Sequence, residues 1–270
     1  MNLIKPSYEI IEQSSGIDGL YKHIELCGRT CYRSQDRITE DSARKFIDGL
    51  IKSGHGAMLE HGTVYLAKEV DYSSSDYLEL EDKYASNKYT KVNYEGGIAY
   101  ITTNLRVLVE NGWMEDLQYL CEPTEYHEKR ITVRYISDIH FYKDTTRHRV
   151  FSWAIESTRF CNYLKEKFGS NISFLIPCWL KEEEELEFEE DLKVIENIYF
   201  KWINKGWQAQ QAAYFLIQGT KAEIIMTGFV SDYKHFFDLR SELAVTGKPH
   251  PTVMELVEPL RREFIKRNLI

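Results

Sequence analysis

The sequence lacks the features of a secreted, disulfide-bonded or membrane protein. It has five cysteines, an odd number, and no CxxC pair, which argues against a disulfide framework and a zinc ribbon. The N-terminal residues carry no apolar run like that of a signal peptide. No stretch approaches the roughly 18 apolar residues of a membrane helix. These absences predict a cytoplasmic protein with reduced thiols and no membrane partner.

Several phosphate-binding and nucleophile motifs are also missing. There is no GxGxxG after a strand, no GxxxxGK[ST] and no GxSxG, so any phosphate would have to be recognised by side chains. The chain has 34 Lys and Arg against 42 Asp and Glu, a net charge of −8. Because proteins that grip nucleic acid usually present a wide basic face, we expect no nucleic-acid partner.

The 270 residues can bury a sizeable core, and no repeat or low-complexity linker divides them. Apolar periodicity and turn residues predict helices over 39–53, 105–119, 186–204, 207–217 and 231–240, and from Thr252 onward. They predict strands over 63–66, 98–103, 131–141 and 172–176. Strands gather in the middle without strand–helix alternation, which predicts a single α+β domain with an antiparallel sheet flanked by helices. Residues 71–130 read as an insertion between two strands.

Polar residues at the predicted helix ends give candidate caps. Thr39 and Ser231 precede helical patterns, and Thr252 forms a capping-box pattern with Glu255. Gly54 is expected to end the helix over 39–53.

The densest chemical signal is the run Arg147, His148 and Arg149, followed by Ser157 and Arg159. Neighbouring cations are most easily explained by an anion between them, and guanidinium groups match phosphate oxygens. The competing interpretation is a solvated basic turn that pairs with nearby acids such as Asp144 and Glu156.

Two other signals are weaker. His55 and His61 are six residues apart with no cysteine nearby, a poor spacing for a metal on one helix, so we predict no metal site. Asp232 and Arg240 stand eight residues apart on one predicted helix. They either line one face of a site or form ordinary helix-end charge pairs.

Three segments together resemble the flavin-dependent thymidylate synthases. Arg147-His148-Arg149, seven residues and then Ser157 resemble the RHRx7S signature of that family. Residues 54–61 are similar to its GHxxxxEH segment, and residues 228–240 resemble its C-terminal helix ending in Leu-Arg. The resemblance implies reductive methylation of dUMP to dTMP, with methylenetetrahydrofolate as carbon donor and NADPH-reduced FAD as hydride source. It also implies a homotetramer whose active sites form at subunit junctions.

The resemblance assigns site residues by position. Arg240 matches a catalytic arginine at the uracil ring. Positions expected to contact FAD are His61, Thr63, Arg147, His148, Arg149 and His235. Positions expected around dUMP are Arg147, Glu156, Ser157, Thr158, Arg159 and Arg240. No cysteine is expected to be the nucleophile.

The chain departs from the family pattern at several positions. Ala154-Ile155 replace a frequent Asn-Glu pair, and Glu156 is the candidate to take over the carboxylate. Asp144 replaces a glutamine, and the family arginine near Ala213 and asparagine near Phe229 are missing.

Two other functions are compatible with the same residues. A nucleotide-binding regulatory module would keep the arginines without needing a flavin. An RNA-binding protein would use residues 147–159 with the interleaved aromatics Phe151, Trp153 and Phe160. The net negative charge of the chain argues against this RNA-binding function.

Overall fold

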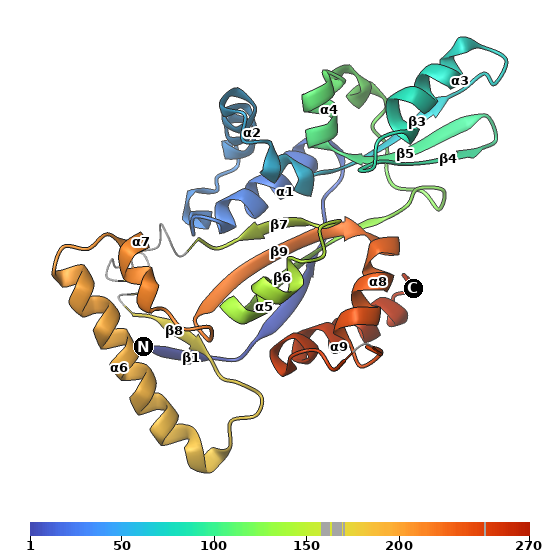
Figure 1. The fold of residues 1–270 in the computed structure, drawn as a ribbon. Coiled ribbons are helices and arrows are strands. Elements are labelled where there is room, and N and C mark those ends of the chain that lie inside the picture. Colours follow the sequence, from blue (N-terminus) through green and yellow to red (C-terminus); the bar gives the residue numbers. More distant parts are fainter. Residues whose placement is uncertain (158–162, 164–168, 170, 246) are drawn as a thin grey trace.

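The computed structural model describes residues 1–157, 163, 169, 171–245 and 247–270 (Figure 1). Its centre is a four-stranded antiparallel sheet in the order β2 (Ser7–Ile11), β6 (Arg130–Asp138), β9 (Lys221–Phe229) and β7 (Ser152–Ile155). The alternation of apolar and polar residues from Ile131 onward therefore forms the strand that the sequence predicts. The α+β class with antiparallel pairing is confirmed.

The two faces of this sheet have different chemistry because side chains alternate along each strand. Val133, Ile224 and Met226 pack into an apolar core with three helices, α5 (Ile139–Thr145), α8 (Val230–Arg240) and α9 (Pro251–Lys266). The opposite face carries Thr132 and Glu223 toward α1 (Gly16–Thr30) and Thr227 toward His61. That face buries polar side chains that must find hydrogen-bond partners.

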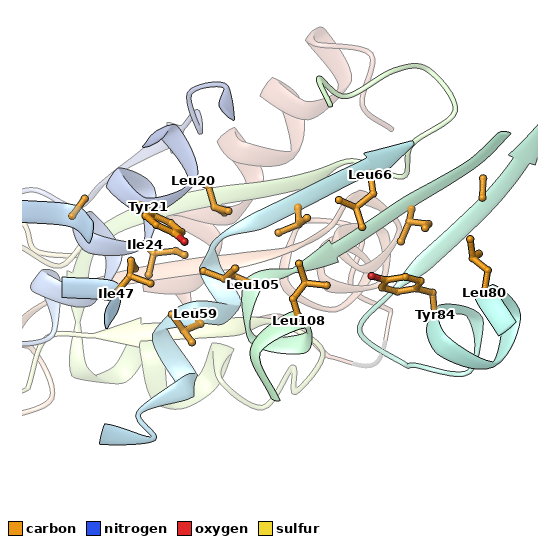
Figure 2. Packing of buried hydrophobic residues seen from close by; sticks show 14 of the residues in the cluster. Leu20, Tyr21, Ile24, Ile47, Leu59, Leu66, Leu80, Tyr84, Leu105 and Leu108 are labelled. Carbon is orange, nitrogen blue, oxygen red and sulfur yellow. The ribbon is translucent and has the colours of Figure 1, made fainter. Parts of the chain in front are cut away.

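A second, three-stranded sheet lies beside the first, in the order β3 (Thr63–Glu69), β5 (Ile98–Asn104) and β4 (Lys91–Glu95). Short helices α3 (Ser75–Leu80) and α4 (Leu105–Asn111) accompany it, and α2 (Ser42–Ser53) lies near α1. Figure 2 shows their shared core, in which Leu20 of α1 packs in one cluster with Leu66, Leu105 and Leu108. Residues 71–130 thus supply two strands to a sheet that β3 begins.

The remaining elements form a separate unit around a third apolar core. β1 (Asn2–Ile4) pairs in parallel with β8 (Ser173–Leu175), an exception to the antiparallel pattern. The long helix α6 (Glu185–Asn204) and the short α7 (Ala209–Ala212) pack around Phe174, Leu192 and Tyr199. Across the described ranges, every helix is too short or too polar to span a lipid bilayer.

Three predicted elements are shorter than the sequence suggests. The helix over 105–119 stops at Asn111, because Gly112 adopts φ 73°, and a 3-10 turn (Met114–Tyr119) follows. The strand over 131–141 stops at Asp138, whose carboxylate accepts the Phe141 N–H at 2.7 Å and so begins α5. The pattern over 207–217 forms only α7 and a 3-10 turn (Ala213–Phe215).

The predicted N-terminal caps are wrong, although the helices are present. Ser42 accepts the Thr39 N–H, and α2 starts three residues later than predicted. The Ser231 N–H donates to the carboxylate of Glu128 at 3.0 Å, and α8 already starts at Val230. His250 precedes α9 and accepts the Thr252 N–H at 3.4 Å. Gly54, with φ 70°, ends α2 as predicted.

Candidate active site

Arg240, in the last turn of α8, is held by the end of α5 and by the segment that follows it. Its Nη1 lies 3.0 Å from Oδ2 of Asp144, and its Nη2 donates to the Asp144 carbonyl at 3.1 Å. Its Nε donates to Nε2 of His148 at 3.1 Å. A guanidinium has five N–H donors, so these three contacts leave two N–H groups for a ligand.

Among the described residues, Arg240 forms its ion pair with Asp144 and not with Asp232 of its own helix. Eight residues of α-helix separate the two backbones by about 12 Å. Asp144 comes from α5 instead, and its side chain and that of Arg240 are each only 18% exposed. The position where the family has a glutamine thus carries the carboxylate that orients Arg240.

His148 is buried beside Arg240 and stays neutral. Its pKa falls to about 4, because burial disfavours the charged ring and the Arg240 and His235 charges oppose it. Since arginine can only donate, Nε2 of His148 must be unprotonated. The ring also packs edge-on against Phe236 at 5.0 Å between centroids. These contacts fix His148 as a support for Arg240.

The other predicted flavin contacts near Arg240 lie on the surface. The Arg147 side chain is 75% exposed, with Nη1 3.9 Å from Oδ1 of Asp144. Arg149 is exposed and lines a cavity of about 260 Å³. His235 is exposed on α8, with its ring 6.1 Å from that of His148. These three side chains are open to an anionic ligand.

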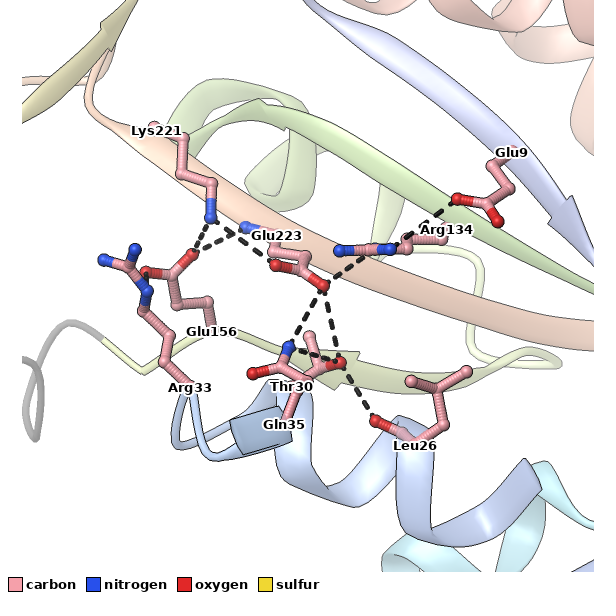
Figure 3. A network of polar contacts seen from close by, with 9 residues as sticks. All are labelled: Glu9, Leu26, Thr30, Arg33, Gln35, Arg134, Glu156, Lys221 and Glu223. Atoms are coloured by element: carbon pink, nitrogen blue, oxygen red, sulfur yellow. Dashed lines mark hydrogen bonds and ion pairs between the residues drawn. The ribbon is translucent and has the colours of Figure 1, made fainter. Parts of the chain in front are cut away.

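Glu156 belongs to a separate network at the other end of β7 (Figure 3). Its Oε2 accepts from Lys221 Nζ at 2.5 Å and from the Glu223 N–H at 3.1 Å, while Arg33 Nε lies 3.6 Å from Oε1. The Ser157 N–H donates to the Cys31 carbonyl at 2.9 Å. Thr158 and Arg159 lie outside the described residues. The Glu156 carboxylate is thus already paired within its own chain.

Glu156 and the neighbouring Ile155, the position of the family carboxylate, lie on opposite sides of the sheet. Neighbouring residues of a strand point to opposite faces. Ile155 packs with the apolar core under α8 and α9. Glu156, with Glu223 and Lys221, lies on the side of the sheet that carries the polar network of α1.

The predicted dUMP residues have two sets of neighbours within one chain. Arg240 contacts Asp144 and His148, beside Arg147 and before β7, whereas Glu156 and Ser157 follow β7 and contact Lys221, Glu223 and Cys31. The four residues of β7 span about 13 Å at roughly 3.3 Å per residue.

His61 and Thr63 lie inside the molecule. His61, in a 3-10 turn (Gly56–His61), is fully buried, with Nδ1 2.8 Å from Oγ1 of Thr227. Burial, together with the charges of His23 and Arg130, lowers its pKa to about 3. The Thr63 N–H donates to Gln13 Oε1 at 2.9 Å, and its hydroxyl accepts from Arg130 at 3.3 Å.

Arg130 is a residue that the sequence patterns did not single out. Nη1 donates to Thr63 and Nη2 to the Glu60 carbonyl at 3.0 Å, while Nε is buried without a hydrogen-bond partner. Burial lowers its pKa to about 10, so it remains charged at neutral pH. In the sequence, Arg130 could have been noticed only as a charged residue at the start of an apolar strand.

Comparison with known proteins places the chain in a family. The family model described as thymidylate synthase complementing protein matches residues 113–262, more than half of the chain. The chain belongs to this family. The matched region contains Arg147–Arg149, Ser157 and Arg240, and it leaves out His61 and Thr63.

Individual proteins match the chain either over a short stretch or at low sequence identity. A flavin-dependent thymidylate synthase of Pyrococcus furiosus is 34% identical over 97 residues, which cover 35% of this chain and 38% of that protein. The UMP/dUMP methylase PolB from Streptomyces cacaoi, bound with 5-Br dUMP, has a TM-score of 0.45 at 15% identity, covering 99% of this chain and 91% of PolB. With 5-Br UMP, PolB gives a TM-score of 0.47 at 14% identity, covering 98% of this chain and 92% of PolB.

Proposed function

We propose that this protein is a flavin-dependent thymidylate synthase that methylates C5 of dUMP. The methylene group comes from methylenetetrahydrofolate, and FAD reduced by NADPH is the hydride source. The observation that carries this proposal is Arg240, fixed by Asp144 and His148 inside the family-matched region with two N–H donors left over. The name of the Pyrococcus furiosus relative supports the same activity.

The donor set around Arg240 fits a flavin dinucleotide. Arg147 and Arg149 are exposed guanidinium groups suited to pyrophosphate oxygens, and Phe229 lines the same cavity as Arg149. Arg147, Arg149 and His235 would hold FAD. His61 is fully buried, so we propose that it positions Thr227 instead of contacting the flavin. When bound, reduced FAD supplies the hydride that completes the methyl group.

The protein's own contribution is orientation and electrostatics. The two remaining Arg240 donors would face the polar edge of the uracil ring, where negative charge develops as C5 becomes nucleophilic. Neutral His148 and the Asp144 carboxylate keep the guanidinium in place for this contact. No cysteine is required as nucleophile.

We also propose a homotetramer whose active sites combine residues of different subunits. The strand β7, which lies between Arg147 and Glu156 in the chain, supports it, because the two predicted dUMP groups could then meet across a subunit junction. A 260 Å³ cavity in one chain would also enclose only part of a dinucleotide.

The test begins with the absorbance spectrum of the purified protein, which should show a bound flavin. Tritium release from [5-³H]dUMP is then measured with NADPH and methylenetetrahydrofolate, with [5-³H]UMP in a parallel reaction. Release from dUMP supports the synthase, and release from UMP alone would redefine the substrate. Nucleotide binding with neither flavin nor release would support the non-catalytic module instead.

A further inference from the structure

The cavity beside Arg149 joins residues 71–112, the part of the segment 71–130 that lies outside the family match, to the family-matched residues 113–262. Four of its lining residues, Lys88, Tyr89, Lys91 and Asn104, come from residues 71–112. The others come from β6, β7, the end of β9, the start of α8 and the segment after α5: Arg130, Arg149, Val150, Ser152, Gly228, Phe229 and Asp232. Two of the family-like motifs and the segment 71–130 thus meet around one space of about 260 Å³.

The cavity concentrates positive charge in a protein whose net charge is −8. Lys88, Lys91, Arg130 and Arg149 face it together with one carboxylate, that of Asp232. In the described part of the chain, none of these four cations has a carboxylate oxygen within 4.0 Å. Such a group of unpaired cations favours an anion among them.

Arg130 gives the strongest indication of a ligand. Its Nη1 and Nη2 donate only to neutral oxygens, and its buried Nε donates to no acceptor. Its guanidinium lies 5.5 Å from the centroid of the Phe229 ring, and Lys91 Nζ lies 5.7 Å from the same centroid. The carboxylates of Glu60 and Asp232 act favourably on this charge but form no ion pair with it among the described residues, and a bound anion would offset more of the cost of its burial.

We propose that the segment 71–130 supplies Lys88 and Lys91 to a phosphate-binding site, completed by Arg130 and Arg149, for a nucleotide ligand of the enzyme. The inference rests on the proposed function for the identity of the ligand. Lys88 and Lys91 are exposed at the rim, where they can meet a phosphate that enters from solvent. Arg130 lies deeper and is already oriented by Thr63 and the Glu60 carbonyl.

The ligand could be FAD, the uridine nucleotide or NADPH, since all carry phosphate. The experiment measures the dissociation constants of FAD, dUMP, UMP and NADPH, at low and high salt, for the full-length protein and the double variant Lys88→Gln/Lys91→Gln. Lys52→Gln, which removes an exposed charge from α2, is the matched control. Because both lysines are exposed and unpaired, the double variant should fold as the parent does.

We expect at least one nucleotide to bind the double variant about tenfold or more weakly, with a smaller salt dependence. The control should bind all four as the parent does. The nucleotide that is weakened identifies the source of the phosphate. Parental affinities of the double variant for all four ligands would overturn the inference while leaving the proposed function intact.

Inorganic pyrophosphate separates the two proposals. If the parent binds neither flavin nor uridine nucleotide, the proposed function fails. Pyrophosphate binding that depends on Lys88 and Lys91 would then still support the phosphate site. If pyrophosphate does not bind, or binds the parent and the double variant equally, the phosphate-site inference is overturned.

Discussion

Nε of Arg240 donates to Nε2 of His148 at 3.1 Å, joining the last turn of α8 to the Arg-His-Arg segment. The bond requires a neutral imidazole, and burial together with the neighbouring charges lowers the pKa of His148 to about 4. Two of the three family-like motifs therefore act as one unit, in which the histidine orients the arginine.

Replacing Arg240 should abolish most catalysis while leaving the flavin bound. Loss of a donor aimed at developing charge typically lowers the rate by about 100- to 1,000-fold. Arg240→Ala and Arg240→Lys should both show this loss, because lysine lacks the planar fork. Tritium release from dUMP and flavin absorbance are measured side by side. Parental turnover by Arg240→Lys, or loss of flavin from either variant, would show that the role assigned to Arg240 is wrong.

Stability should fall as the pH drops below about 6.5. Burial lowers the pKa of His61 to about 3 and of His23 to about 4, against about 6.5 in the unfolded chain. Between these values the unfolded chain binds more protons, so the free energy of unfolding is highest above pH 6.5 and decreases toward pH 3.

The contribution of His61 can be isolated by urea unfolding from pH 7.5 to 4.5. In His61→Asn, an amide replaces the titrating ring beside Thr227, so the loss of stability with acid should be smaller than in the parent. The difference should approach about 1.4 kcal/mol per pH unit at low pH. Equal pH slopes in parent and variant would contradict the assignment of a neutral, buried His61.

Cysteine variants should keep dTMP formation. Burial raises the pKa of the Cys27, Cys31, Cys121 and Cys178 thiols, which disfavours the nucleophilic thiolate. Cys161 lies outside the described residues and is included in the set. Cys27→Ala should lower stability by about 1 to 3 kcal/mol, because it leaves a gap beside Ala154 and Ile225. A variant that folds and binds FAD but forms no dTMP would identify a required thiol.

Sedimentation with FAD should report about four chains per particle, as expected for a closed symmetric oligomer. A complementation test is sharper. Arg240→Ala and Ser157→Ala are each expected to be inactive alone. Co-expression of the two should restore activity at sites that take an intact Arg240 from one subunit and an intact Ser157 from another. An active monomer, or co-expressed protein without activity, would contradict a shared site.

Much of the fold was predictable because its signals are local. The apolar stripes over 186–204 and 231–240 became α6 and α8, and the alternation after Arg130 became β6. Gly54 ended α2 because a residue without Cβ readily adopts φ 70°. The motif around Arg147 and the helix ending at Arg240 indicated the family, which the match over residues 113–262 shows.

Tertiary structure decided which residues those motifs contact. The Nη2 of Arg240 bonds Asp144, 96 positions away in sequence, and not its helix neighbour Asp232. The extended β7 separated Arg147 from Glu156, although only eight positions lie between them. Arg130 gained its hydrogen-bond partners Glu60 and Thr63 from the pairing of distant segments. Sequence by itself determined the residue types and local periodicity, whereas partners and burial depend on contacts between segments that no local pattern encodes.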